Sequence, residues 1–286
     1  MRLFEERGVV LFDAAMGTAL LAAGQPKGSG SEMMNISAPE TVLRIHLENI
    51  NAGSDVITSN TFGITQMMTR GENATGIVEK TVGIAKEAAE HKEVFVCLGI
   101  GPSGALLGPY GDTSYESVEE IYAAQAEAGS GAGADFIILE TFADVEEFAR
   151  AARAIKSSCD LPVLGTMTFS ESGRTFMGAS PKDLIAVAKA ENLIATGANC
   201  TLDPEEMIPI LTELMSLADG LPIIAQPNAG QPVYAEGDVA YKTSAEAFIA
   251  GAEKLLDLGI SGIGGCCGTT PAIISAIRDI IDRRCK

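Results

Sequence analysis

Short apolar segments alternate with longer amphipathic segments along the whole chain. Each apolar segment contains few polar residues, as expected for a parallel strand that is buried on both faces. We predict eight strands from this pattern. They cover residues 9–13, 55–58, 94–99, 136–141, 163–168, 194–199, 223–227 and 262–265.

Each predicted strand is followed by a segment whose apolar residues recur with helical spacing. Several of these segments begin with residues that cap helices, such as Asp144, Asp203-Pro204 and Ser180-Pro181. We predict eight helices from them. They cover residues 39–52, 72–90, 114–132, 144–157, 180–191, 203–217, 244–258 and 271–284.

Eight strand–helix units in a chain of 286 residues predict an α/β fold, a (β/α)8 TIM barrel that forms a single domain over residues 1–286. A doubly wound parallel sheet is the alternative, but such sheets usually have fewer strands. Two connections, residues 24–38 and 228–243, are longer than ordinary loops. Connections of this length in a compact domain are often functional.

The balance of charged residues argues against two classes of partner. The chain has 20 Lys and Arg residues against 38 Asp and Glu residues, a net charge of −18. An acidic surface repels phosphate groups, so we expect neither nucleic acid nor an anionic membrane as a partner. No apolar run reaches the ~18 residues of a membrane span, and the first residues include acids where a signal peptide is basic. We therefore expect a cytoplasmic protein.

Three cysteines fall where a TIM barrel has its active site, at the C-terminal ends of the strands. Cys200 follows the sixth predicted strand, and Cys266 and Cys267 follow the eighth. Three thiolates suit Zn²⁺, with Zn–S distances of about 2.3 Å and one position left for a substrate. Plain thiols without metal are the simpler interpretation, and a structural zinc is the other metal interpretation. Structural sites usually have four closely spaced ligands, which argues against one here.

The other three of the six cysteines are not placed in this way. Cys97 lies inside the third predicted strand, so we expect a small core residue. Cys159 and Cys285 lie beside predicted helix ends. Six cysteines in a chain of this length are too few for a disulfide framework, so the thiols are expected to be free, metal-bound or catalytic.

Eight motifs spread over the whole chain carry a resemblance to a known family. They are LFDAAMGT (11–18), ITSNTFG (57–63), GPSGALLGPYGD (101–112), DFIILETFAD (135–144), TMTFSESGRTFMG (166–178), GANC (197–200), QPNAGQP (226–232) and GGCCGTTP (264–271). The combination of GANC with GGCCGT is highly specific. On these motifs the sequence resembles the homocysteine S-methyltransferases, and most of all the homocysteine-binding barrel of cobalamin-dependent methionine synthase.

The resemblance implies a zinc ion that activates the homocysteine thiol for methylation to methionine. It implies Cys200, Cys266 and Cys267 as zinc ligands. Asn228, in the turn after the seventh predicted strand, would be a weak fourth ligand before substrate arrives. From the sequence alone, an ordinary turn residue is the simpler interpretation of Asn228.

The resemblance also implies the contacts that hold the amino-acid part of homocysteine. Asp13 and Glu140 would bind its ammonium group, although a turn residue and a helix-start charge are their simpler interpretations. Backbone amides of the Ala15-Met16-Gly17 turn would bind its carboxylate. Asn60 and Thr168 would make secondary contacts.

One residue departs from the family pattern. Ala14 stands where the family usually has Gly. If the backbone at this position needed a positive φ, Ala would strain it and change how the carboxylate is bound.

The methyl donor is the least defined part of the prediction. The SNTF and MTFSESGRT motifs favour methylcobalamin or another methylcorrinoid, and the sequence ends at Lys286, so we expect a separate corrinoid protein to carry it. A sulfonium donor such as S-methylmethionine is the alternative. A non-catalytic module that binds zinc or an amino acid is a third interpretation. An aldolase-type barrel is disfavoured, because it usually has a Lys at a strand end and no predicted strand here ends with one.

Overall fold

The computed structural model describes residues 3–6, 8–26, 28–235 and 238–284, so Cys285 lies outside the described residues. Eight parallel strands form one sheet in the order β1-β10-β7-β6-β5-β4-β3-β2. Their bounds are β1 (Val10–Leu11), β2 (Val56–Thr58), β3 (Phe95–Ile100), β4 (Phe136–Phe142), β5 (Val163–Met167), β6 (Thr196–Asn199), β7 (Ile223–Gln226) and β10 (Gly262–Ile263). All eight predicted strands are confirmed.

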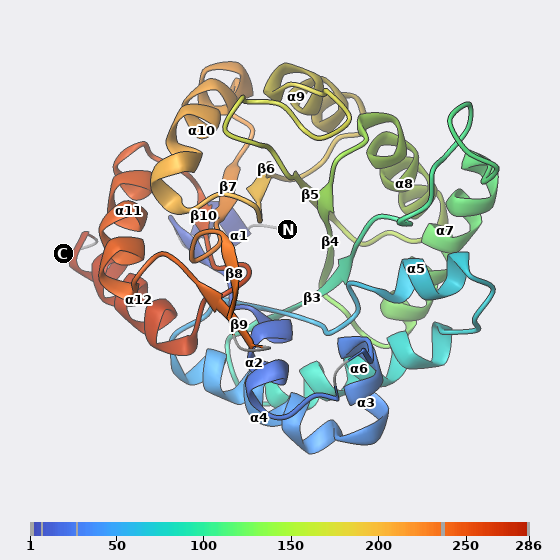
Figure 1. Cartoon of the computed structure of the whole chain (residues 1–286), viewed down its shortest axis with the longest axis horizontal. Coiled ribbons are helices and arrows are strands. Elements are labelled where there is room, and N and C mark those ends of the chain that lie inside the picture. The colour runs from blue at the N-terminus through green and yellow to red at the C-terminus, as the bar shows by residue number, and fades with distance from the viewer. Residues whose placement is uncertain (1–2, 7, 27, 236–237, 285–286) are drawn as a thin grey trace.

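Eight helices surround the strands as an outer ring, which Figure 1 shows in a view along the barrel. They are α4 (Pro39–Asn51), α6 (Thr75–Ala88), α7 (Tyr115–Gly131), α8 (Val145–Ser158), α9 (Pro181–Ala190), α10 (Pro204–Ala218), α11 (Ala245–Asp257) and α12 (Pro271–Arg284). The predicted caps are present: Asp144 accepts from the amides of the first turn of α8, and Ser180 and Asp203 form capping boxes. The chain is therefore a single-domain (β/α)8 barrel, as predicted.

Two aspartates close the seam between β1 and β2, where the strand ladder is interrupted. The Asp55 N–H donates to the Leu11 carbonyl at 2.7 Å, and the Leu11 N–H donates to the Asp55 carboxylate at 2.8 Å. Arg278 pairs with the same carboxylate at 3.1 Å. At the C-terminal end of the seam, the Thr58 N–H donates to Asp13 Oδ2 at 2.8 Å. Side-chain oxygens thus replace strand carbonyls and hold Asp13 beside β2.

The inside of the barrel is filled from its N-terminal end. The short helix α1 (Leu3–Glu6) lies at that end, and Leu3 packs in one buried cluster with Phe12, Cys97 and Phe136. Cys97 is fully buried in this cluster, as predicted for a core residue. Since the N-terminal end is packed in this way, a pocket is left to the opposite end.

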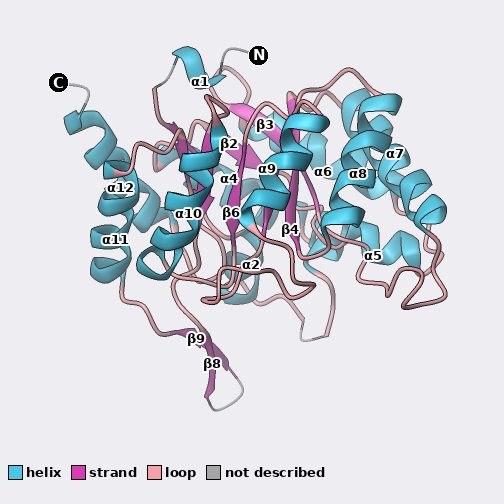
Figure 2. Ribbon diagram, turned by 90° about the horizontal axis from the view of Figure 1, so that it is seen from above, coloured by secondary structure: helices cyan, strands magenta, loops and turns pink. Residues whose placement is uncertain are grey.

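The connections that follow β1, β2 and β7 contain short elements that the sequence pattern did not predict. α2 (Met16–Ala22), the 3₁₀ helix η1 (Ser31–Met33) and α3 (Met34–Ser37) lie between β1 and α4, and α5 (Ile64–Thr69) follows β2. After β7, the strands β8 (Pro232–Ala235) and β9 (Asp238–Tyr241) pair antiparallel as a hairpin. Figure 2 shows this hairpin and α1 at opposite ends of the molecule. Among the described residues, no helix is both long and apolar enough to cross a membrane.

Candidate metal and substrate site

A pocket of about 500 Å³ opens at the C-terminal ends of the strands. The sequence assigned ten residues to the site, and eight of them line this pocket. They are Asp13, Ala15, Met16, Asn60, Glu140, Cys200, Cys266 and Cys267. Thr168 and Asn228 are not part of its lining.

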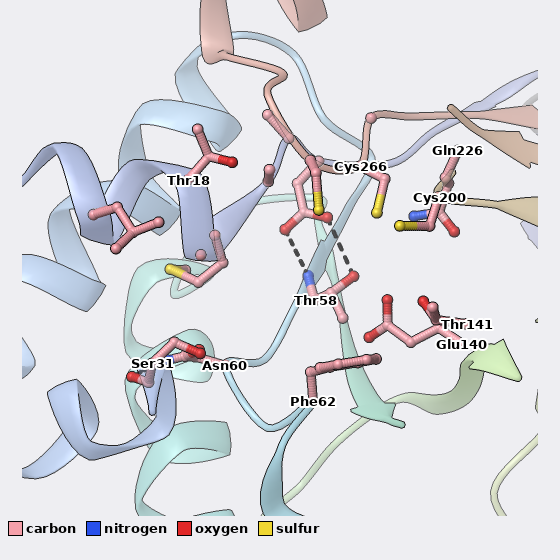
Figure 3. Close-up of a pocket in the computed structure, with 18 of the residues that line it drawn as sticks. Thr18, Ser31, Thr58, Asn60, Phe62, Glu140, Thr141, Cys200, Gln226 and Cys266 are labelled. Atoms are coloured by element: carbon pink, nitrogen blue, oxygen red, sulfur yellow. Dashed lines mark hydrogen bonds between the residues drawn. The ribbon is translucent and has the colours of Figure 1, made fainter. Parts of the chain in front are cut away.

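The three cysteines predicted to act together form one cluster in the pocket wall. Their sulfur atoms all lie within 4.8 Å of one another, and Figure 3 shows Cys200 and Cys266 facing each other. Cys200 has φ of 63°, a left-handed conformation that is rare for a residue with a side chain. The Cys200 N–H donates to the Gln226 carbonyl at 3.0 Å, and the Cys266 N–H donates to the Pro227 carbonyl at 2.8 Å. The strained backbone of Cys200 and these bonds on both sides of β7 bring the thiols together.

The protonation of the cluster suits a cation. Hydrogen bonds from Cys200 and Cys266 lower the pKa of Cys267 to about 3. Bonds to Cys200 and Cys267 raise the pKa of Cys266 well above its usual value. One thiolate is thus stabilised by the protons of its neighbours. Sulfur ligands of a tetrahedral zinc ion lie about 3.8 Å apart, so a metal ion that replaced those protons would need only a small contraction.

Asn228 lies beside this cluster, on the backbone that holds it. Its neighbour Ala229 donates its N–H to the Cys267 carbonyl at 2.9 Å. The Asn228 side chain is 3% exposed, and its Oδ1 has no hydrogen-bond partner among the described residues. A buried carbonyl oxygen without a partner is unfavourable. The three soft sulfur donors of the cluster fit a zinc site, and Asn228 is joined to the cluster through the backbone bond of Ala229.

Two buried carboxyl groups face the same pocket. Asp13 accepts from the Thr58 N–H at 2.8 Å and from the Thr58 hydroxyl at 3.2 Å (Figure 3, dashed lines). Burial outweighs these bonds and raises the pKa of Asp13 to about 7. Burial, together with the charge of Asp13, raises the pKa of Glu140 to about 8. Two carboxyl groups in this state favour a cationic ligand, because a positive charge would let both ionise.

A local irregularity of β4 aims Glu140 into the pocket. The register between β4 and β5 shifts between Leu139 and Phe142, and Thr141 has φ of 64°. Asn199 holds this bulge, because its Oδ1 accepts the Thr141 N–H at 2.8 Å and its Nδ2 donates to the Thr141 hydroxyl at 2.7 Å. Bulges of this kind often re-aim a side chain beside a functional site.

The start of α2 forms the opposite wall of the pocket. The Ala15 N–H is already used, because it donates to the Thr269 hydroxyl at 3.1 Å. The amides of Met16 and Gly17 lie in the first turn of the helix, where no intrahelical acceptor is available to them. Ala14 donates its N–H to Asn49 Oδ1 at 2.9 Å and is not among the residues with positive φ. The departure from Gly at this position therefore causes no backbone strain.

The two secondary contacts are placed differently. Asn60 lines the pocket, and its Nδ2 donates to the Ser31 carbonyl at 2.7 Å. This bond ties β2 to the segment that follows α2. The Thr168 hydroxyl instead forms a hydrogen bond with the Thr201 hydroxyl. The position of Thr168 does not support a direct contact with a ligand in the pocket.

Several lining residues were absent from the sequence-based site. They are Thr18, Phe62, Thr141, Gln226 and Tyr241. Thr141 and Gln226 stand at predicted strand ends, which was the available signal. The Gln226 side chain is 6% exposed, and its Oε1 has no hydrogen-bond partner among the described residues. Tyr241 comes from the hairpin that the sequence pattern did not predict.

Comparisons with known proteins concern the sequence and the fold of the chain. The sequence profile of the family described as homocysteine S-methyltransferase matches residues 10–281. The chain is 28% identical to the methionine synthase of Mycobacterium tuberculosis, over 94% of this chain and 24% of that protein. It is also 28% identical to homocysteine S-methyltransferase 2 of Arabidopsis thaliana, over 87% of this chain and 85% of that protein.

A solved structure with the same fold is the metallated form of the homocysteine methyltransferase MmuM of Escherichia coli. It matches with a TM-score of 0.82 at 24% identity, over 97% of this chain and 98% of that chain. At this identity the likeness concerns the fold. The chain spans about a quarter of the length of the methionine synthases that it matches.

Proposed function

The chain belongs to the homocysteine S-methyltransferase family, and from this premise we propose that it transfers a methyl group to the thiol of homocysteine to give methionine. The whole barrel, residues 1–286, is proposed as the homocysteine-binding domain. The observation that carries the proposal is that one pocket contains both the thiol cluster and the buried acid pair. Homocysteine has a thiol at one end and an ammonium group at the other, so it matches both.

Cys200, Cys266 and Cys267 are proposed to hold a zinc ion, with Asn228 as a weak ligand in the absence of substrate. When bound, Zn²⁺ would supply the Lewis acidity that converts the homocysteine thiol into its nucleophilic thiolate at neutral pH. The cysteines favour zinc over harder ions because their sulfur atoms are soft donors. The orphan oxygen of Asn228 supports its role, since a weak oxygen ligand is readily displaced by a thiolate.

The remaining site residues are proposed to bind and orient the amino acid. Asp13 and Glu140 would accept hydrogen bonds from the ammonium group, and its charge would displace the protons that they hold. The amides of Met16 and Gly17 would donate to the carboxylate. Asn60, through its hydrogen bond to the Ser31 carbonyl, would fix the position of the segment around Ser31 at the edge of the pocket. Orienting the thiol in this way would lower the activation barrier of methyl transfer by several kcal/mol.

We propose a methylcorrinoid, carried by a separate protein, as the methyl donor. A corrinoid is too large to enter a pocket of about 500 Å³ beside homocysteine, so it would have to dock at the mouth. The exposed large hydrophobic side chains of the described residues support a docking surface there, because all of them lie in segments that follow the C-terminal ends of strands. They are Leu21, Met33, Ile36, Phe62, Leu106, Tyr110, Phe176, Met177 and Val233.

A small sulfonium donor is the second candidate, and the size of the pocket favours it. A volume of about 500 Å³ is within the range of small-molecule sites and has room for homocysteine with S-methylmethionine. Both donors would use the same zinc and homocysteine contacts. The residues of the pocket therefore do not distinguish the two donors, and an assay has to.

The test combines metal content with turnover. Reduced protein and the Cys200→Ala variant are loaded with zinc, dialysed and analysed for zinc per chain. Each is then incubated with homocysteine and either methylcobalamin or S-methylmethionine, and methionine is measured. Glu127→Gln, which changes an exposed residue of the outer helix α7, is the matched control.

We expect about one zinc per chain, loss of zinc and activity in Cys200→Ala, and methionine from methylcobalamin. Methionine from S-methylmethionine alone would replace the corrinoid donor with a sulfonium. Zinc and homocysteine binding without methionine from either donor would favour a non-catalytic binding module. Reduced protein that binds no zinc would contradict the metal site itself.

A further inference from the structure

Two segments that are far apart in the sequence carry the two ends of the proposed substrate site. Asp13, at the end of β1, is one of the buried acids, and Cys266 and Cys267 belong to the thiol cluster. The Gly265 N–H donates to the Asp13 carbonyl at 3.0 Å. The end of β1 and the cysteine turn are therefore joined directly, and the contacts between them help to set how far the acid lies from the sulfur atoms.

The Thr269 hydroxyl joins these two segments a second time. It accepts the Ala15 N–H at 3.1 Å and donates to the Cys266 carbonyl at 2.7 Å. A hydroxyl group suits this position, since it can accept from one segment and donate to the other through the same oxygen. A Cβ atom on Gly265 would overlap this hydroxyl, so glycine leaves the room that it occupies. Thr269 is 2% exposed and is not part of the pocket lining, so it acts only through its neighbours.

A second hydroxyl joins the same segments from the side of α2. Thr18 lies in the first turn of this helix, and its hydroxyl accepts the Gly268 N–H at 3.0 Å. Together with the bonds above, it unites residues 13–18 and residues 265–269, and we call this unit the clasp. The strand pairing of β1 with β10 ends before the site residues, so the clasp continues the connection up to them.

The clasp has a consequence for the length of the acceptor that fits. The proposed substrate spans from the buried acids to the thiol cluster, so its length has to match their separation. Homocysteine has two methylene groups between its Cα and its sulfur, whereas cysteine has one. We propose that Thr269 is a positioning residue that holds the Cys266 turn at the distance from Asp13 that homocysteine spans, and so selects homocysteine over cysteine. This inference rests on the proposed function.

The selection depends on the rigidity of the site. An acceptor that is shorter by one methylene group can reach the acids or the thiol cluster, but a rigid site does not let it reach both. Binding sites commonly discriminate one methylene group by roughly 10- to 200-fold. If the clasp were loosened, the cysteine turn would be free to move relative to the acids, and this discrimination would fall.

The experiment measures the preference for acceptor length instead of turnover. Thr269→Val removes both bonds of the hydroxyl, Thr269→Ser keeps them, and Thr18→Val removes the acceptor of the second connection. Thr212→Val, which changes an exposed threonine of the outer helix α10, is the matched control. Each protein is loaded with zinc and its zinc content is measured. Calorimetry then gives the dissociation constants of homocysteine and of cysteine.

A second measurement needs neither metal nor ligand. Amide hydrogen exchange of the zinc-free proteins is followed by mass spectrometry in peptides that cover residues 12–20 and 262–270. Exchange reports local opening of hydrogen-bonded segments. Thr269→Val should accelerate exchange in both peptides, and Thr269→Ser and Thr212→Val should leave it unchanged.

We expect the dissociation constant of cysteine, divided by that of homocysteine, to fall roughly tenfold in Thr269→Val through weaker binding of homocysteine. Thr18→Val should lower this ratio as well, and Thr269→Ser and the control should keep it. An unchanged ratio in Thr269→Val, or equal weakening of both ligands, would overturn the inference, since Thr269 would then have a structural role only. If Thr269→Val does not fold, the ratio in Thr18→Val decides.

The outcomes for the wild type separate this inference from the proposed function. A wild type that binds zinc and both amino acids equally well would overturn the inference and leave the proposed function standing. A wild type that binds neither zinc nor homocysteine would contradict the proposed function. The hydrogen exchange would then decide on the clasp itself: faster exchange of both peptides in Thr269→Val would support it, and unchanged exchange would overturn it.

Discussion

Replacing Glu140 with Gln should stabilise the metal-free protein while weakening homocysteine binding. Burial and the charge of Asp13 raise the pKa of Glu140 from 4.5 to about 8. Between these two values the folded protein keeps a proton that the unfolded chain has released. The contribution of Glu140 to the stability of the wild type therefore falls by ~1.36 kcal/mol per pH unit as the pH rises through this range.

Gln has no proton to lose, so this contribution is absent from the variant. The free energy of unfolding of Glu140→Gln, relative to the wild type, should increase by about 2 kcal/mol between pH 6 and pH 8. Because the chain has no Trp, unfolding by urea is best followed by far-UV circular dichroism. The exposed Glu171 supplies the control, and Glu171→Gln should stay within about 0.5 kcal/mol of the wild type at each pH.

The same variant should bind homocysteine less tightly. A hydrogen bond to a charged group contributes about 1.5–3 kcal/mol, so we expect roughly a 10- to 100-fold loss of affinity in calorimetry with zinc-loaded protein. Parallel pH dependence of the wild type and the variant would refute the raised pKa. A stability gain with unchanged affinity would refute the ammonium site and leave Glu140 as an unfavourable buried acid without a ligand.

Three further predictions follow from buried groups. Gly99→Ala should displace the Glu140 side chain, because the added Cβ would lie 2.6 Å from Glu140 Oε1. Calorimetry should show roughly tenfold weaker homocysteine binding, with at most about 3 kcal/mol lost in stability. Unchanged affinity would contradict the role of Glu140 in binding. Burial lowers the pKa of His46 from 6.5 to about 4, so the unfolded chain takes up a proton first, and His46 alone should cost the protein about 2 kcal/mol of stability from pH 7 to pH 5, opposite in sign to the contribution of Glu140. His46→Leu should lack this loss in urea titrations. Asn228→Ala should weaken zinc binding in a chelator competition without homocysteine and have little effect once homocysteine is present; equal weakening in both would contradict a displaceable ligand.

The sequence predicts the barrel well because its pattern and its packing have the same origin. A strand buried on both faces has to be apolar, and a helix on the outside has to be amphipathic. β5 and α8 therefore have almost the predicted bounds. The hairpin of β8 and β9 was not predicted, because its short strands stand off the barrel and pair only with each other.

The rule that strand ends line the site predicts positions but not side-chain directions. Cys200 follows β6 and Thr141 lies near the end of β4, and both reach the pocket with left-handed backbones, a conformation that the sequence pattern does not predict. Thr168 also follows a strand, but its hydroxyl pairs with Thr201. Neighbouring residues of an extended chain point to opposite sides. A shift of one position along the strand therefore decides whether a side chain enters the pocket or packs outside it.

Asp13 shows why a structural and a functional interpretation of one residue can both hold. From the sequence, a turn residue and an ammonium ligand were alternatives. In the structure its carboxylate accepts two hydrogen bonds from Thr58 across the β1–β2 seam and also lines the pocket. Each carboxylate oxygen has a second lone pair, so closing the barrel leaves acceptor sites free for a ligand. The seam that gives Asp13 its structural role also buries its carboxyl group, and burial is the largest cause of its raised pKa. The interruption of the strand ladder thus produces a buried carboxyl group that a cationic substrate would help to ionise.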